Sequence, residues 1–337
     1  MVTMQQVADR AGVSISTVSF VVNDTKPVTP ETRERVLQAI SDLGYRRNTI
    51  ARALASRRTR ILALIYPLID HRNHNAFIES AATAAREHGY NLVLWPLHSD
   101  DVSTEITSLI QAGFADGVLL MEVQLDDERV QRLREADAPF ALIGRTRDLE
   151  GIDYVDIDFE RSIETAIDDL AALGHRHFSL VVEDWSATPL AGYAPPIRTE
   201  QAFRAAIAQR GFEGAVFRAP HQAHAVSTIV DRVLREASAT TAIISLHDEV
   251  SAAFVNTLPH RGVAVPADMS VVAIASAPTL AEQLDPPLTV YPGPGGELGR
   301  RAAEALIARL DGRGGPRVQT LIPCTLHEGG TVGPARM

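Results

Sequence analysis

The sequence lacks the features that define several large classes of protein. It contains one cysteine, Cys324, so the chain can form neither an internal disulfide nor a cysteine-rich zinc site. No stretch approaches the ~18–20 uncharged apolar residues that a transmembrane helix needs. The polar N-terminus, from Met1 to Arg10, shows no secretory signal. We therefore expect a cytoplasmic protein without a membrane partner.

The motifs of common enzymes are missing as well. There is no P-loop, no Gly-x-Ser-x-Gly elbow and no His-Glu-x-x-His sequence. The 11 histidines are scattered, and although His71, His74, His175 and His177 could in principle meet at a metal, we expect no metal site. Cys324 lies in a strand-like pattern and is expected to be an inert buried thiol. The sequence thus predicts a protein that is not an enzyme and needs no cofactor.

The charge is distributed unevenly along the chain. The 337 residues carry a net charge of −10, which by itself argues against nucleic-acid binding. Residues 1–60, however, hold ten basic and five acidic side chains, a net +5, whereas the remainder carries −15. With 45% hydrophobic and 22% charged residues, the chain can bury a large core. This pattern indicates a small basic module joined to an acidic globular body.

The basic segment has the pattern of three short helices. From Met4 to Ala11 the apolar residues recur at the spacing of an amphipathic helix, with Thr3 as a cap before it and Gly12 as a stop after it. Ser14 offers a cap for a second helix, and a third begins at Thr29-Pro30-Glu31. Two helices separated by about three residues that include glycine form a helix-turn-helix, whose second helix enters the major groove of DNA.

Short stretches within this segment follow a recognisable order and spacing. They are Val7-Ala8, Ala11-Gly12-Val13-Ser14, Ser16-Thr17-Val18-Ser19, Asn23, Thr32-Arg33-Glu34-Arg35-Val36, Leu43-Gly44-Tyr45, and Asn48 followed by Ala51-x-x-Leu54. Together they resemble the headpiece of the lactose-repressor (LacI/GalR) family. The resemblance implies a helix-turn-helix headpiece over residues 1–47 and a hinge helix or linker over residues 48–60.

The resemblance also assigns DNA contacts to side chains. The residues that it turns toward base edges are Ile15, Ser16 and Phe20, and those that it places on phosphates are Thr17, Ser19, Asn23, Thr32 and Arg33. Phosphate contacts fix the register and carry little sequence information. Phe20 departs from the family, which usually has a polar or basic residue there, very often arginine. Because phenylalanine offers only apolar contact, for example with a thymine methyl, we expect no guanine preference at that base; the alternative is that Phe20 packs inside the module.

The segment from Asn48 to Ser56 resembles the hinge helix of the family. At about nine residues it is too short to be stable alone, so we expect it to order only on DNA and within a dimer. Leu54 matches the leucine that wedges into the minor groove, and Ala51 allows the close approach. The alternative for Leu54 is a core position of an ordinary amphipathic helix. Arg47 stands where the family commonly has proline, which predicts a less rigid entry to the hinge.

From about Arg60 onward, apolar strands alternate with helical patterns. The expected strands are Ile61–Tyr66, Asn91–Trp95, Gly117–Met121, Phe140–Ile143, Tyr154–Ile157, Phe178–Val182, Ala242–Leu246, Ser270–Ile274 and Leu288–Tyr291. The expected helices are Ala76–His88, Arg161–Leu173, Thr199–Arg210, Ala225–Glu236 and Glu297–Leu310. Proline- and glycine-rich stretches at residues 195–196, 286–287 and 292–296 are predicted to be loops or crossovers. The alternation predicts an α/β fold with doubly wound parallel sheets.

This body resembles the effector domain of the same family, which is similar to periplasmic sugar-binding proteins. The matching stretches are Gly89-Tyr90, Leu142-Ile143-Gly144-Arg145, Leu173-Gly174-His175, Pro266-Ala267-Asp268-Met269-Ser270-Val271-Val272 and Pro286-Pro287-Leu288-Thr289. The resemblance implies an effector-binding and dimerisation domain over residues 61–337. Its N-lobe would hold about 61–160 and 292–322, and its C-lobe about 161–291 and 323–337. An effector would bind between the lobes, at the carboxyl ends of the strands, and bias the angle between them.

The effector contacts follow less directly. The residues that the resemblance brings to the cleft are Arg198, His247, Asp248, His74, Asn73 and Asp70, although each could instead be a solvated loop residue. Gly144 and Ala275 stand where sugar-binding members often have aspartates, so the usual acceptors for ring hydroxyls are missing. Among sugars, sugar acids and phosphorylated metabolites as possible effectors, we therefore expect an acidic or phosphorylated metabolite rather than a neutral monosaccharide. Weak or absent effector sensing is the alternative.

The sequence as a whole predicts a homodimeric, sequence-specific DNA-binding transcription regulator, more specifically a repressor. Two headpieces would bind a pseudo-palindromic operator, because the two-fold symmetry of the protein is mirrored in the DNA. A small-molecule effector would modulate that affinity. The alternative is a solute-binding protein of the periplasmic type without DNA function, which the basic headpiece and the missing signal disfavour.

Overall fold

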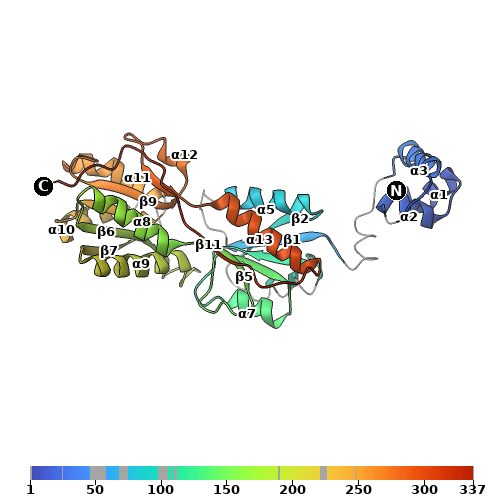
Figure 1. The fold of residues 1–337 in the computed structure, drawn as a ribbon, viewed down its shortest axis with the longest axis horizontal. Helices are drawn as coiled ribbons and strands as arrows, with labels where there is room; N and C mark the ends of the chain where they lie inside the picture. Colours follow the sequence, from blue (N-terminus) through green and yellow to red (C-terminus); the bar gives the residue numbers. More distant parts are fainter. Residues whose placement is uncertain are drawn as a thin grey trace. The chain divides into compact units, whose positions relative to one another are not determined.

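The computed structural model describes residues 2–24, 26–45, 58–67, 75–97, 105–106, 108–109, 112–188, 190–220, 226–246 and 248–336 (Figure 1). The chain forms two compact units, Met1–Thr59 and Arg60–Met337. The first unit is helical and the second contains two parallel sheets, which confirms the predicted fold class.

Three helices make up the first unit: α1 (Met4–Ala11), α2 (Ile15–Asn23) and α3 (Pro30–Leu43). Their caps are the predicted ones, since the side chains of Thr3, Ser14 and Thr29 each accept a hydrogen bond from a backbone N–H in the first turn. Gly12 and Gly44 end α1 and α3 in the left-handed conformation that glycine adopts without strain. The buried core that joins the helices consists of Val7, Ala8, Ala11, Val18, Val21, Val22, Val36 and Ala39.

A six-stranded sheet forms one lobe of the second unit. Its strands are β1 (Ile61–Pro67), β2 (Asn91–Leu97), β3 (Gly117–Leu120), β4 (Phe140–Ile143), β5 (Asp153–Ile157) and β11 (Gln319–Ile322), in the order β11-β5-β4-β3-β1-β2 and all parallel. The residues of β1 alternate between two cores, as the period of two in a strand requires. Leu62 and Leu64 pack with α5 (Asn75–Glu87) and α13 (Gly295–Leu310), whereas Ala63 and Ile65 pack with α7 (Glu128–Glu135) on the other face (Figure 1).

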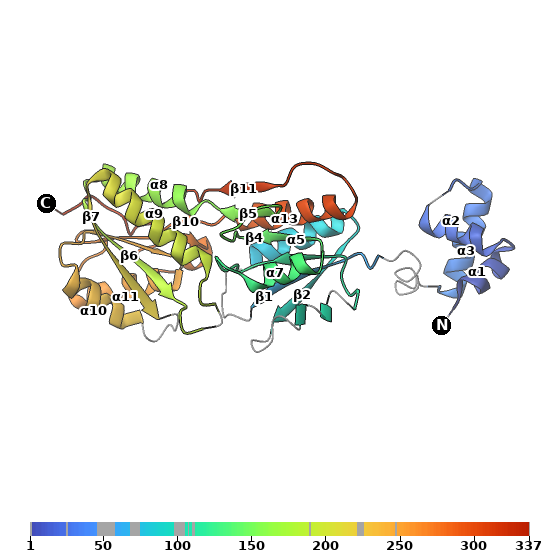
Figure 2. The ribbon, with the colours of Figure 1, turned by 90° about the horizontal axis from the view of Figure 1, so that it is seen from below.

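A five-stranded parallel sheet forms the other lobe. Its strands are β6 (His177–Asp184), β7 (Glu213–Pro220), β8 (Ala242–Leu246), β9 (Ser270–Ser276) and β10 (Thr289–Pro292), in the order β10-β9-β8-β6-β7. Helices α8 (Phe159–Ala172) and α9 (Ala194–Arg210) cover one face, and α10 (Val226–Glu236) and α11 (Asp248–Thr257) cover the other (Figure 2). The shorter elements η2 (Leu258–Arg261) and α12 (Pro278–Ala281) lie between α11 and β10 in the sequence.

The sequence patterns miss two strands and misassign two proline-containing stretches. β7 contains Gly214 and ends at Pro220, and β11 has only four residues, so neither shows the long apolar run of a central strand. Both lie at sheet edges, where such residues are tolerated. Pro195-Pro196 was predicted as a loop but occupies the first turn of α9, where a missing N–H costs nothing. Residues 292–296 were predicted as a loop or crossover, but Pro292 ends β10 and Gly295 begins α13. Cys324 is free and buried, and burial raises the pKa of its thiol to about 11, as expected for an inert group.

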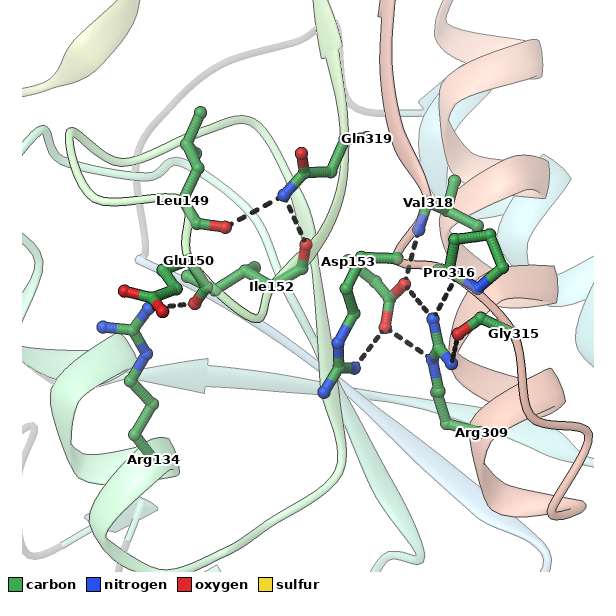
Figure 3. Close-up of polar contacts among 11 residues, drawn as sticks. Arg134, Leu149, Glu150, Ile152, Asp153, Arg309, Gly315, Pro316, Val318 and Gln319 are labelled. Carbon is green, nitrogen blue, oxygen red and sulfur yellow. Dashed lines mark hydrogen bonds and ion pairs between the residues drawn. The ribbon is translucent and has the colours of Figure 1, made fainter.

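One buried carboxylate ties the C-terminal segment to the six-stranded sheet. Asp153, at the start of β5, is fully buried and accepts hydrogen bonds from Arg309 Nε and Nη2, both at 2.9 Å, and from Arg317 Nη1 at 2.6 Å (Figure 3). The backbone N–H of Val318 donates to it at 2.7 Å. Although burial raises the pKa of Asp153, these hydrogen bonds outweigh it and hold the pKa below its ordinary value. Asp153 thereby joins α13, the loop after it and β11 to β5.

Replacing Asp153 with asparagine should lower the free energy of unfolding by about 2–3 kcal/mol, because Arg309 and Arg317 lose their counter-charge. The cost stays below the ~3–5 kcal/mol of a fully buried pair, since both guanidinium groups are partly exposed. The matched control is Asp148→Asn, whose exposed pair with Arg134 should contribute less than about 1 kcal/mol. Urea-unfolding midpoints at pH 7 measure both, and equal losses would contradict the role of Asp153.

The stabilisation by Asp153 has a defined pH dependence. Because the pKa of Asp153 is lower in the folded chain than its ordinary value of 3.8, its stabilisation is complete above pH ~4 and is lost as the pH falls through the folded pKa. The stability difference between the wild type and Asp153→Asn should therefore shrink only in acid.

Candidate functional site

One face of α2 in the first unit carries both polar and apolar side chains that lie outside the core. Ile15 and Ser16 are exposed at the start of the helix, and Ser19 and Phe20 follow four residues later, so that they lie on the same helix face. Ile15 exposes 44% of its surface, which is large for an isoleucine in so small a unit. Phe20 is half-buried and does not belong to the core, so the alternative of a core phenylalanine is not what the structure shows.

Three of the predicted phosphate contacts, Thr17, Thr32 and Arg33, lie in the first turn of a helix. Thr17 and Thr32 are each the third residue of a helix, and their hydroxyls are 2.9 Å from those of Ser14 and Thr29. The N-termini of helices favour anions because of their free N–H groups and the helix dipole. Arg33, on α3, forms an ion pair with Asp24, so its charge is partly neutralised.

Some predicted DNA contacts cannot be placed. The backbone of Asn23 closes α2, and its side chain is outside the described part of the structure. Asn48, Ala51 and Leu54, together with Arg47, lie outside the described residues.

Sequence reasoning missed one residue of this surface. Lys26 follows α2, and its Nζ lies 5.0 Å from the centroid of the Phe20 ring. The sequence shows Lys26 only as one of ten basic residues, because no periodicity links a loop residue to a helix side chain.

In the second unit, backbone hydrogen bonds join the two lobes. The segment after β3 meets the segment that leads into α9, where the N–H of Leu125 donates to Gly192 O at 2.9 Å and that of Ala194 donates to Val123 O at 3.0 Å. These bonds hold the start of α9 beside the carboxyl end of β3, the edge where parallel sheets place ligands.

Arg198 projects from α9 toward the six-stranded lobe. Its Nη2 donates to the carbonyl of Thr146 at 3.1 Å, and its Nη1 lies 3.7 Å from Glu160 Oε1. Its Nε is buried and has no hydrogen-bond partner among the described residues. Burial lowers the pKa of Arg198, and the neighbouring guanidinium of Arg145 lowers it further.

Arg145 follows β4 and shares Glu160 with Arg198. Its Nε donates to Asp156 Oδ2 at 3.0 Å and its Nη2 to Glu160 Oε2 at 2.5 Å. Burial would lower the pKa of Arg145, but the two carboxylates raise it above its ordinary value. Burial raises the pKa of Asp156 to about 6, against the opposite pull of Arg145 and Arg198. Both arginines are thus already matched by carboxylates.

Further carboxylates lie close to the same junction. Tyr193, in the segment before α9, is hydrogen-bonded to Glu122, and burial together with Glu122, Glu183 and Asp156 raises its pKa well above the ordinary value. Its ring meets that of Trp185 edge to face, with centroids 6.1 Å apart. Glu122 and Glu183 are both buried. Among the described residues, this junction therefore brings together four carboxylates and two guanidinium groups.

The structure gives a reason for one missing aspartate. Gly144 has a φ of 119°, and a Cβ at this position would lie 3.0 Å from Val123 Cγ2. A side chain here would therefore be strained and crowded. Ala275, at the other departure, is buried with a φ of 55°.

Of the remaining effector candidates, the structure describes only the backbone of Asp248. Asp70, Asn73, His74 and His247 lie outside the described residues, and Asp248 begins α11 with its side chain undescribed. Sequence reasoning proposed Arg198, which the structure brings to this junction, but it did not propose Arg145, Asp156, Glu160 or Tyr193, because their partners are not neighbours in the sequence.

Of the four histidines considered for a metal site, His175 has a structural role, and His71 and His74 lie outside the described residues. His175 Nδ1 lies 2.8 Å from Thr241 Oγ1, and its Nε2 lies 3.0 Å from the carbonyl of Gly333. Over the described residues, no group of three or more His, Cys, Asp or Glu side chains could hold a metal ion. None of the helices described there is long and apolar enough to span a membrane.

Comparison with known families gives two matches. Residues 3–48 match the family described as bacterial regulatory proteins, lacI family, and residues 167–332 match the periplasmic binding protein-like domain. The chain is 31% identical over 327 residues to the HTH-type transcriptional regulator CelR of Thermobifida fusca, covering 92% of both chains. It is 28% identical over 304 residues to the HTH-type transcriptional regulator DegA of Bacillus subtilis (strain 168), covering 88% of each.

Two solved structures are similar along nearly the whole chain. A complex of transcriptional regulator CelR with cellobiose has a TM-score of 0.72 at 27% identity, covering 98% of this chain and 100% of that one. The lac repressor dimer bound to operator and the anti-inducer ONPF has a TM-score of 0.84 at 23% identity, covering 98% and 99%.

Proposed function

This chain belongs to the lacI family of bacterial regulatory proteins, and from that membership we propose that it represses transcription as a homodimer on a pseudo-palindromic operator. As a member it is a DNA-binding transcriptional regulator with an effector-binding domain, and it is not an enzyme. We propose a headpiece over residues 1–47, a hinge over 48–60 and an effector-binding and dimerisation part over 61–337. The latter would divide into lobes of about 61–160 with 292–322, and 161–291 with 323–337.

The observation that carries the DNA proposal is the exposed face of α2 in a unit of net positive charge. Ile15, Ser16 and Phe20 would meet base edges, because they lie outside the core on one face of the helix. The proposed phosphate contacts are Thr17, Ser19, Asn23, Thr32 and Arg33, and the proposed hinge contacts are Asn48, Ala51 and Leu54. The lac repressor structure, a dimer on operator, has this fold.

We propose that the effector is a neutral sugar, in place of the acidic metabolite expected from the sequence. Arg145 and Arg198 are already paired with Asp156 and Glu160, so neither offers an unmatched positive charge. The unpartnered Nε of Arg198 can still donate to a hydroxyl oxygen. The CelR complex with cellobiose, a neutral sugar, supports this class. The proposed contacts are Arg198 with Asp70, Asn73, His74, His247 and Asp248.

Selection of the full chain on a pool of random duplexes should enrich one pseudo-palindromic sequence. Binding to that duplex should weaken steeply with salt, because each neutralised phosphate adds about −0.9 to the log–log slope. A fluorescence-anisotropy titration over a salt series measures it. A pool without any enriched sequence would contradict the proposed function.

Replacing Asp24 with asparagine should tighten operator binding by about two- to fivefold, because Arg33 no longer has to leave a carboxylate to reach a phosphate. The matched control is Asp42→Asn, which removes the same charge from a pair with Arg10 in the same unit. Fluorescence-anisotropy titrations measure the operator affinity of both variants. An equal gain for the control would show that only net charge matters.

A thermal-shift screen of neutral sugars and their acid or phosphorylated counterparts, followed by calorimetric titration, should find binding among the neutral members only. Glu160→Gln should let an anionic counterpart bind, because it leaves Arg145 and Arg198 with less negative charge between them. Tight binding of an acid by the wild type would refute the neutral class. Binding of neither class would refute effector sensing by the compounds screened.

A further inference from the structure

The contact between Phe20 and Lys26 joins a recognition-helix side chain to a loop cation. The Lys26 ammonium lies 5.0 Å from the ring centroid, within the range of a cation–π interaction. Lys26 is exposed and Phe20 is half-buried outside the core. Neither side chain is therefore needed to hold the three helices together.

An aromatic ring holds a cation without cancelling its charge. Arg10 and Arg33, in the same unit, are paired with the carboxylates of Asp42 and Asp24. Among the described residues, Lys26 contacts a π face and no carboxylate, so its three N–H donors and its charge can serve a further partner. Restricting a flexible lysine before binding also reduces the conformational entropy that binding would cost.

We propose that Phe20 and Lys26 form one reading unit in the major groove: the ring contacts a thymine methyl, and the ammonium donates to O6 and N7 of a guanine in the adjacent base pair. This inference rests on the proposed DNA function. The chemistry fits both halves, because a ring offers apolar contact and lysine is a donor to guanine O6 and N7. The Phe20 side chain itself still does not recognise guanine. The preference for guanine comes from Lys26 and applies to the adjacent base pair.

The base-reading role is tested by selection on random duplexes with the full-length wild type, Lys26→Met and Phe20→Leu. The wild type should show a guanine beside a thymine in each half-site. Lys26→Met should flatten the guanine preference, by about five- to tenfold in affinity for guanine over other bases, and leave the other positions unchanged. Phe20→Leu should weaken both preferences. Arg10→Met removes a headpiece charge outside the proposed contacts and should leave the motif as it is.

The opposite results are equally distinct. If Lys26→Met weakens all duplexes alike and reduces the salt slope by about 0.9 for each lost contact, Lys26 binds a phosphate and the proposal is wrong. If Lys26→Met changes nothing, the proposal is also wrong. If the wild type enriches no sequence at all, the DNA function fails, which is a separate outcome from failure of the reading unit.

A second measurement needs no DNA. Lys26 is the only lysine of the chain, so reductive ¹³C-methylation labels one lysine side chain besides the terminal amine. Methylation keeps the positive charge, and the ring current of Phe20 should move the methyl signal upfield of a free dimethyl-lysine. Phe20→Leu should abolish that shift while the circular-dichroism melting curve shows that the variant is folded. The same chemical shift in both proteins would overturn the positioning role.

Discussion

Two arginines that share one glutamate connect the two lobes of the second unit. Arg145 and Arg198 come from different lobes, and both reach Glu160. A guanidinium group in a poorly solvated junction has to be paired with a carboxylate, because a buried charge without a counter-charge strongly destabilises the folded state. The pairs therefore set the net charge of this junction, and they join α9 to the segment after β4.

In the first unit, the residues of the core are separate from those of the exposed surface. Its core is filled by small apolar residues on three short helices, and hydroxyl caps and two left-handed glycines fix the helix ends. The larger apolar side chains of Ile15 and Phe20 do not belong to this core. They remain on the surface of α2. The residues that hold the first unit together thus differ from the residues proposed to read DNA.

The chain passes between the lobes more than once, and a contact of its own secures its return to the six-stranded sheet after β10. α13 and β11 return to the six-stranded sheet after β10 has completed the other one. Asp153 holds them there through Arg309, Arg317 and the backbone of Val318 (Figure 3). A carboxylate with four donors is a stronger tie than the short strand β11 alone. This contact lets a four-residue strand serve as a stable sheet edge.

The sequence by itself determined the three headpiece helices, the α/β class and most strands, because capping residues and apolar periodicity act over a few neighbouring residues. It also singled out the face of α2 and Arg198. It missed β7 and β11, since an edge strand needs no continuous apolar run, and it mistook a helix start at Pro195 for a loop. The tertiary structure alone decided the partners of Asp153, the sharing of Glu160 and the place of Lys26 over Phe20. Those pairs depend on how separate segments meet in space, and charge neutralisation between distant residues leaves no local pattern in the chain.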